Sequence, residues 1–361
     1  MAKRVGILTF IDTLNYGAEL QAYALNRAIS KLGYESEIIN YTCQAVHQRE
    51  TPRRPKISDL KTPKRFLGLA LKYPKLRRRA HSFKRFSETH TPRGQFVSGE
   101  DDIIRDYDTV VVGSDQVWCA SVTNADPMFL LPNRAASKPR VISYAASFGD
   151  EVVPVHSRGL YAQALRSFDR LSIREKQGLE ILKELGVKQQ AEINVDPTML
   201  LDAAEWTELS ARPLIDGKYL FVYMVTKREE TMAFAKQAAE RLGLDIAYID
   251  AYGGRPYYGA RNMGSASPDE FVSLVKHAAY VVTSSFHGMC FAILFNKQFR
   301  FVAAENEGHS RLFNLANEIG LSRCCSSNDS LTESIEYAMV NSRIGSMRDQ
   351  ALRYLKNHIS I

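Results

Sequence analysis

Short apolar runs alternate with segments of helical periodicity along the whole chain. Residues 4–10 form the first apolar run, and the helix that we expect from Gly17 carries apolar side chains at helical spacing from Leu20 to Leu32. Gly33 ends this helix, and a second apolar run covers 35–41. A strand, a helix and a strand in this order predict an α/β fold with largely parallel sheets.

The same alternation continues toward the C-terminus. The predicted strands cover 108–113, 140–146, 170–173, 218–225, 245–250 and 279–283. The predicted helices cover 156–168, 175–185, 229–243, 268–279, a segment from His287, and 346–361. The pattern restarts after residues 196–198, and 361 residues exceed the size at which one core stops growing. We therefore expect an N-terminal domain over 1–202 and a C-terminal domain over 203–361 that includes the terminal helix.

Composition and cysteine usage exclude several classes of protein. Hydrophobic residues make up 45% and charged residues 24% of the chain, which are ordinary values for a folded globular protein. The five cysteines show no CxxC spacing, which argues against a disulfide framework and a zinc site. No apolar run has the length of a membrane span, and residues 5–10 are too short for the core of a secretory signal. We expect a cytoplasmic protein without a metal.

The net charge of +7 is unevenly distributed. Residues 42–99 contain 15 Lys and Arg against three acids, a net charge of +12, and the rest of the chain is acidic. Apolar residues alternate with the basic ones, so we expect a basic, amphipathic helical insertion that interrupts the first domain. A solvated basic face is one interpretation. The more specific interpretation is that residues 49–85 bind an anionic membrane surface or a phosphate-bearing acceptor. Binding of nucleic acid ranks lower, because no RNP, KH or zinc-finger motif is present.

Polar loops follow several of the predicted strands, at the sheet edge where ligands bind in α/β proteins. The loops are Asn15-Tyr16-Gly17, Gly113-Ser114-Asp115-Gln116-Val117-Trp118, Ser143-Tyr144-Ala145-Ala146-Ser147-Phe148-Gly149, Ser172-Ile173-Arg174-Glu175, Asp196-Pro197-Thr198 and Ser284-Ser285-Phe286-His287-Gly288. Two domains whose strand ends face each other would enclose a central cleft between these loops.

With these loops, and with residues 6–10 and 20–25, the chain resembles the polysaccharide pyruvyl transferases from residue 5 to about residue 325. The resemblance implies two Rossmann-like domains facing a central cleft, as in GT-B glycosyltransferases. It implies transfer of an enolpyruvyl-derived group from phosphoenolpyruvate to two hydroxyls of a sugar, which gives a pyruvate ketal and phosphate. The setting would be synthesis of capsule or exopolysaccharide, with a saccharide acceptor that a polyprenyl diphosphate can carry, and no cofactor beyond the donor.

A donor with a carboxylate and a phosphate requires cationic partners, for which Arg174 and Arg311 are the candidates. An ion pair between domains or on the surface is the alternative for either arginine. His287 is the candidate general acid that protonates the methylene carbon of the donor, because histidine titrates near neutrality. A structural histidine at a helix start is the alternative. Part of the family has an arginine two residues before this histidine, where this chain has Ser285.

The contact of that missing arginine would come from Ser284, Ser285 and helix amides, or from Arg311. Asp115 and Asp196 are candidate bases for the acceptor hydroxyls, with Asp115 ranked above Asp196 because residues 196–198 are equally a turn.

Sugar hydroxyls could bind Asn15, Tyr16 and Ser114, and Trp118 could be a stacking platform. An Asx turn at Asn15 and a core position for Trp118 are the alternatives.

Two other functions remain. A GT-B-type glycosyltransferase would use a nucleotide-sugar donor, because a fold does not decide a function. A non-catalytic assembly protein would dock on the membrane through its basic insertion and would not need His287. The pyruvyl transferase is ranked first, with the basic residues 49–85 holding it as a peripheral protein at the inner face of the cell membrane.

Overall fold

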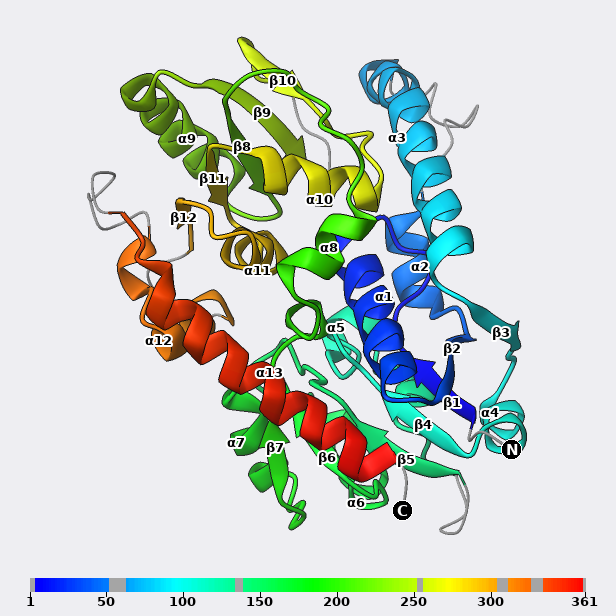
Figure 1. Cartoon of the computed structure of the whole chain (residues 1–361). Helices are drawn as coiled ribbons and strands as arrows, with labels where there is room; N and C mark the ends of the chain where they lie inside the picture. Colours follow the sequence, from blue (N-terminus) through cyan, green and yellow to red (C-terminus); the bar gives the residue numbers. More distant parts are fainter. Residues whose placement is uncertain are drawn as a thin grey trace.

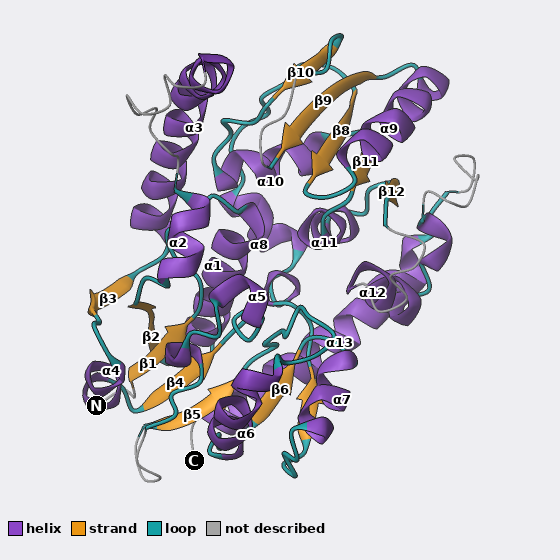
Figure 2. Ribbon diagram, turned by 180° about the vertical axis from the view of Figure 1, so that it is seen from behind, coloured by secondary structure: helices purple, strands orange, loops and turns teal. Residues whose placement is uncertain are grey.

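The structure is a computed structural model that describes residues 4–51, 63–133, 139–251, 256–303, 311–325 and 334–359. It contains two parallel sheets, one above the other, with helices on both faces of each (Figures 1 and 2). This arrangement confirms the predicted α/β class with two Rossmann-like domains.

The first sheet has the strand order β3-β2-β1-β4-β5, and all its neighbouring pairs are parallel. Its strands are β1 (Arg4–Leu8), β2 (Glu35–Asn40), β3 (Arg93–Phe96), β4 (Thr109–Val112) and β5 (Arg140–Ser143). A parallel pair, β6 (Leu171–Ile173) and β7 (Ala191–Ile193), continues the sheet through isolated bridges from Ile142 and Ala146. The helices of this half are α1 (Tyr16–Lys31), α2 (Gln44–Glu50), α3 (Pro63–His90), α4 (Glu100–Asp106), α5 (Ala120–Thr123), α6 (Arg158–Arg166) and α7 (Gln177–Glu184).

The second sheet repeats this topology with the order β10-β9-β8-β11-β12. Its strands are β8 (Tyr219–Met224), β9 (Asp245–Asp250), β10 (Ala260–Asn262), β11 (Tyr280–Thr283) and β12 (Phe299–Phe301). The helices are α8 (Ala203–Leu209), α9 (Arg228–Leu242), α10 (Pro268–His277), α11 (Phe286–Leu294) and α12 (Arg311–Ile319). In both sheets the order reverses beside the first strand, and such a reversal places the ligand site at the carboxyl ends of the strands.

A long helix, α13 (Tyr337–Ile359), runs from the second half back along the first (Figure 1). The Tyr354 hydroxyl donates to the Ser143 carbonyl at 2.9 Å, and the Thr109 hydroxyl donates to the Ile359 carbonyl at 3.0 Å. The helix that the sequence predicts over 346–361 therefore begins earlier, at Tyr337, and covers strands of the first sheet.

The basic insertion contains α3, as the sequence predicts, but one of its arginines does not lie on a solvated face. Arg79 is only 2% exposed. Its guanidinium donates to the Ala251 carbonyl at 2.8 Å and to the Leu14 carbonyl, and lies 4.9 Å from the ring centroid of Tyr16. Ala251 follows a strand of the second sheet and Leu14 follows β1, so Arg79 ties α3 to both halves of the protein. None of the helices in the described ranges has the length and apolar character that crossing a bilayer would require.

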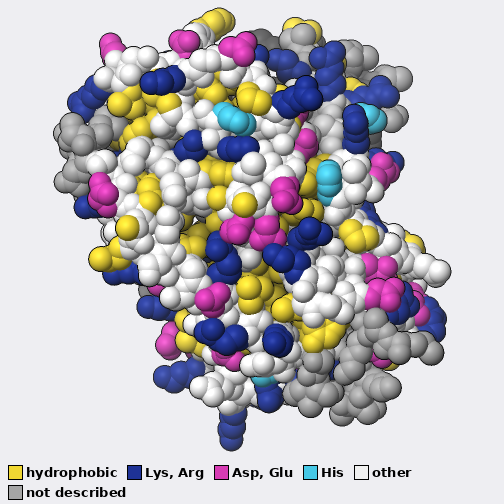
Figure 3. Space-filling model, viewed as in Figure 1, with side chains coloured by type: hydrophobic (Ala, Val, Ile, Leu, Met, Phe, Trp, Pro, Cys, Tyr) yellow, Lys and Arg dark blue, Asp and Glu magenta, His cyan; other side chains and the backbone are white. Residues whose placement is uncertain are grey.

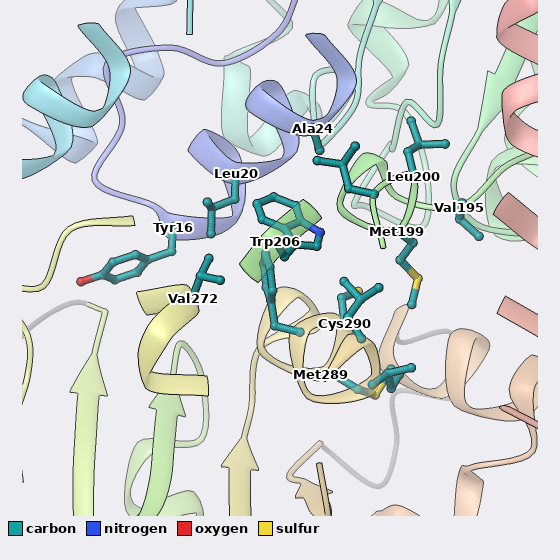
Figure 4. Packing of buried hydrophobic residues seen from close by; sticks show 14 of the residues in the cluster. Tyr16, Leu20, Ala24, Val195, Met199, Leu200, Trp206, Val272, Met289 and Cys290 are labelled. Atoms are coloured by element: carbon teal, nitrogen blue, oxygen red, sulfur yellow. The ribbon is translucent and has the colours of Figure 1, made fainter. Parts of the chain in front are cut away.

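Between the two sheets lies a continuous apolar core, shown in Figure 4. Trp206 on α8 is fully buried there and packs edge-on against Phe291, with ring centroids 4.8 Å apart. Its indole N–H donates to the Thr198 carbonyl at 2.9 Å. Tyr16 stacks on Phe271 of α10 in the second half, with ring centroids 4.8 Å apart. These contacts join the two halves through apolar surface, which is the main source of stabilisation in protein interiors.

Because Trp206 fills the space between the halves and satisfies the Thr198 carbonyl, we predict that Trp206→Ala lowers the free energy of unfolding by about 3 to 5 kcal/mol. Urea denaturation followed by circular dichroism would measure this loss. Tyr258→Ala is the matched control, since this ring is 93% exposed and its removal should leave the midpoint unchanged. Equal midpoints for both variants would contradict the assigned packing.

Candidate functional site

The loops that the sequence singles out meet at the carboxyl ends of strands β4 to β7. The Ser147 hydroxyl and the Phe148 amide both donate to Glu175 Oε1, at 2.7 Å and 3.1 Å. The Arg174 amide donates to the Ala146 carbonyl at 3.2 Å, and the Ser147 amide donates to the Asp115 carbonyl at 2.9 Å. Parallel strands end at one edge of the sheet, so three loops distant in sequence form one hydrogen-bonded layer.

Arg174 lies at the centre of this layer and is almost fully buried. Its Nη1 donates to Asp196 Oδ2 at 2.8 Å, its Nη2 lies 3.6 Å from Asp115 Oδ1, and its Nε lies 3.7 Å from Glu175 Oε2. Its guanidinium also lies 5.0 Å from the ring centroid of Phe286. Burial alone would lower the pKa of Arg174, but the three carboxylates raise it above its usual range.

Asp196 connects Arg174 to His287. Its Oδ2 accepts from Arg174 and lies 3.4 Å from His287 Nε2, while its Oδ1 accepts from the amide and hydroxyl of Thr198 at 3.0 Å and 2.8 Å. Burial would raise the pKa of this carboxyl, but His287, Arg174 and the Thr198 amide more than offset burial and hold the pKa well below its usual range. Asp196, ranked below Asp115 from the sequence, thus contacts both Arg174 and His287.

His287 is held at the start of α11 by a close approach of the first domain. The Ser285 hydroxyl caps this helix by accepting from the Gly288 amide at 3.3 Å. On the other side, a Cβ at Gly17 would lie 2.0 Å from His287 Nδ1, so only glycine at the start of α1 leaves room for the imidazole. Gly17 of one domain and Asp196 at the domain connection therefore fix the ring of a histidine that belongs to the other domain.

Arg174 and Arg311 line one pocket between the two halves of the protein, with a cavity volume of about 60 Å³. Burial lowers the pKa of Arg311, and the nearby charge of Arg174 lowers it further. The pocket is lined by Arg174, Glu175, Lys176, Asn194, Asp196, Phe286, Arg311, Asn314, Glu318, Met347 and Gln350, among others. His287 and Asp115 are outside this lining and reach it through Asp196 and Arg174. Among the described residues, Arg311 forms no ion pair.

Several buried polar atoms of this layer have no hydrogen-bond partner among the described residues. They are Nε and Nη2 of Arg174, Oε2 of Glu175, Nε2 of His287 and Oδ1 of Asn194. Buried polar groups are normally paired, so a cluster of donors and acceptors without hydrogen bonds beside a pocket indicates a place for a polar ligand. On the face drawn in Figure 3, basic and acidic side chains lie next to one another across the middle of the molecule.

Other predicted site residues form hydrogen bonds or packing contacts within the protein. The Ser114 hydroxyl donates to the Ala145 carbonyl at 2.6 Å, and the Ser284 hydroxyl donates to the Thr226 carbonyl at 2.6 Å. Asn15 caps α1 by accepting from the Gly17 amide at 2.9 Å, and the Tyr16 hydroxyl donates to the Ala266 carbonyl at 2.7 Å. Trp118 is buried in the core of the first half, where its N–H donates to the Phe129 carbonyl at 3.0 Å. The structure does not bring these five side chains to the pocket.

Some pocket residues escaped the sequence analysis. Asn314 and Glu318 lie on α12, and Met347 and Gln350 lie on α13. These helices carry no motif, and only the return of α13 onto the first half brings them to the site. Glu175 did carry a signal, since it directly follows Arg174 at a strand end. Within the described ranges, no group of three or more His, Cys, Asp or Glu side chains is arranged to hold a metal ion.

Comparison with known proteins supports both the fold and the motifs. A family model for polysaccharide pyruvyl transferase matches residues 15–306, which include the loops from Asn15 to His287. A search of curated proteins finds no match to the chain.

Among solved structures, a candidate UDP-N-acetylglucosamine 2-epimerase from Listeria monocytogenes has a TM-score of 0.53 and 11% identity, covering 99% of this chain and 97% of that chain. Another UDP-N-acetylglucosamine 2-epimerase has a TM-score of 0.50 and 9% identity, covering 98% and 94% of the two chains. At this identity the likeness shows the fold alone, which is the GT-B-like pair of Rossmann-like domains.

Asp196 should control the acid stability of the protein. Its pKa is depressed in the folded state, so its carboxylate stabilises the fold above the unfolded pKa of about 3.9, and this contribution is lost as the pH falls further. We predict that Asp196→Asn lowers the free energy of unfolding at pH 7 by about 3 to 5 kcal/mol, because Arg174 loses its closest partner. Urea denaturation at pH 7, 5, 3.5 and 2.5 should show the same difference at pH 7 and 5 and a difference that narrows progressively below pH 4. A difference that stays constant with pH would contradict the ion pair.

Proposed function

The chain belongs to the polysaccharide pyruvyl transferase family, and we propose that it moves an enolpyruvyl-derived group from phosphoenolpyruvate to two hydroxyls of a saccharide. The products are a cyclic pyruvate ketal and inorganic phosphate. The observation that carries this proposal is the pair Arg174 and Arg311 on one pocket, with unpaired guanidinium nitrogens of Arg174 beside it. A small donor with two anionic groups matches this pair in charge.

Arg311 and Arg174, whose Nε and Nη2 form no hydrogen bond with a described residue, hold the phosphate and the carboxylate of the donor. Arg174 is already positioned by Asp196, and planar guanidinium groups bind both kinds of anion through paired hydrogen bonds. The Oε1 atom of Glu175 already accepts hydrogen bonds from Ser147 and Phe148, so this oxygen does not compete with the donor for Arg174. Because Ser285 caps α11 where part of the family has an arginine, Arg311 on α12 supplies the second cation.

The chemistry requires a proton at one carbon and a nucleophile at its neighbour. His287 delivers a proton to the methylene carbon of the donor, which becomes a methyl group, while the first sugar hydroxyl forms a bond to the adjacent carbon and gives its proton to Asp115. The bond from that carbon to the phosphate oxygen then breaks, and phosphate leaves with the electron pair. The second hydroxyl closes the ketal, and its proton leaves with phosphate.

Asp196 has a positioning role in this scheme. Its carboxylate faces His287 Nε2 at 3.4 Å and is placed to pair with the protonated imidazole before the proton is transferred. The reaction needs no redox step and no cofactor beyond the donor. The acceptor is a saccharide that a polyprenyl diphosphate can carry, bound from the side of the α1 loop and of Asp115.

The glycosyltransferase alternative gains no support from the structural neighbours. The two reported structures are only 11% and 9% identical to this chain, so the nucleotide sugars in their names do not transfer to it.

We predict that phosphoenolpyruvate binds the purified protein and that Arg311→Ala weakens this binding by about 10- to 100-fold, the effect of losing one charge-assisted contact. Titration calorimetry would measure both affinities. Arg241→Ala, which removes an exposed arginine from α9, is the control and should bind as the unmodified protein does. Binding of nucleotide sugars without binding of phosphoenolpyruvate would overturn the proposal.

His287 should affect turnover more than donor binding. We predict that His287→Gln retains phosphoenolpyruvate binding within about threefold but releases phosphate at least about 100-fold more slowly in the presence of an acceptor, the contribution of a general acid. A coupled phosphate assay with a panel of oligosaccharides would measure the rate. Full activity in His287→Gln would remove this histidine from the mechanism.

A further inference from the structure

Helix α3 carries a concentration of positive charge that the proposed transfer reaction does not use. Its sequence from Pro63 to His90 contains nine Lys and Arg and one acid, Glu88. Figure 3 shows basic side chains gathered over this helix, at the upper right of the view.

The inner face of α3 anchors the helix to the body of the protein. Phe83 and Phe86 are buried in the core, and the Ser82 hydroxyl donates to the Ser265 carbonyl at 3.4 Å. Arg79, on the same face, binds the carbonyls of Leu14 and Ala251. The helix is therefore held against both halves and presents its other side in a fixed orientation.

The outward face contains the remaining cations of the C-terminal half of α3. Successive residues of a helix are about 100° apart, so Arg77, Arg78, Lys84 and Arg85 point away from the side that contains Arg79 and Phe83. All four are exposed. Leu67, about five turns before Arg85 on the same helix, is 59% exposed.

Most of these outward cations have no role within the described structure. Lys84 has an acidic partner, Glu88 at 3.7 Å, and both side chains are exposed. Arg77, Arg78 and Arg85 form no ion pair with a described residue. Cations that do not stabilise the fold remain available for an external anionic surface.

We propose that the outward face of α3, defined by Arg77, Arg78, Lys84 and Arg85, binds the anionic surface of a lipid membrane. A fixed helix with several cations and an exposed aliphatic side chain has the composition of a helix that lies in the membrane interface. Single-stranded nucleic acid is bound by several exposed aromatic rings, whereas Phe83 and Phe86 face the core and Tyr73 is only partly exposed. This inference does not depend on the identity of the donor.

The test is sedimentation of the full chain with vesicles of phosphatidylglycerol and phosphatidylcholine, compared with pure phosphatidylcholine vesicles. Each Lys or Arg at an anionic surface contributes a factor of about five to partition, so the variant Arg77→Gln/Arg78→Gln/Arg85→Gln should bind about 100-fold more weakly. The matched control is Lys218→Gln/Lys236→Gln/Arg241→Gln, which removes the same charge from exposed positions on the second half. The control should bind like the unmodified protein.

Binding that requires the anionic lipid, falls as salt is raised and is lost only in the α3 variant would support the proposal. The proposal fails if the unmodified protein does not bind anionic vesicles at low salt, or if both variants bind equally. If the protein binds a single-stranded RNA of mixed sequence and does not bind vesicles, the outward face of α3 is a nucleic-acid site instead. Thermal unfolding of both variants checks that they are folded. The assay contains neither phosphoenolpyruvate nor an acceptor, so its outcome is independent of the transfer reaction.

Discussion

The candidate site depends on one buried cation. Arg174 is surrounded by Asp115, Glu175 and Asp196, which come from three separate strand ends. A buried arginine without such partners would be strongly unfavourable, and removal of one partner would leave the other charge uncompensated. The buried carboxylates are in turn stabilised by the charge of Arg174, so the loops after β4, β6 and β7 are held in a single arrangement. His287 joins this arrangement through Asp196, and the second domain is thereby coupled to the first at the point where the pocket lies.

The two halves are also joined by neutral contacts. Trp206 and Tyr16 pack between the sheets, and Arg79 binds carbonyl groups on both sides. Trp206 lies next to the charged layer, because it binds the carbonyl of Thr198, two residues after Asp196. Arg174 and Asp196 are almost fully buried, so little water screens their interaction. Apolar packing sets the distance between the domains, and this distance allows Asp196 to contact His287 of the second domain.

Much of the architecture could be predicted from the sequence. The structure confirms the predicted strands β1, β2, β4, β5, β6, β8, β9 and β11 within a few residues. It also confirms the helices α1, α9 and α10, which have strong periodicity. The short strands β3, β7, β10 and β12 were missed. Three or four residues do not establish an alternating pattern, and β3, β7 and β10 also lack the continuous apolar run that marks β4. At the site, residues on strand-end loops were predictable by their position. Asn314 and Gln350 were not, because long-range packing alone brings α12 and α13 to the pocket. Residues 196–198 suited both a turn and a site from the sequence, and the structure shows that the Asp196 carboxylate accepts from the Thr198 amide of the turn and also binds Arg174.

The return of α13 onto the first sheet has a consequence for the order in which the protein is made. Strands β4 and β5 are synthesised early, yet Thr109 and Ser143 bind groups of residues 354–359, and Met347 and Gln350 complete the pocket. More than two hundred residues are synthesised between the end of β5 and residues 347–359. The first domain thus leaves the ribosome with an uncovered face, and the pocket becomes complete only after residues 347–359 have been translated.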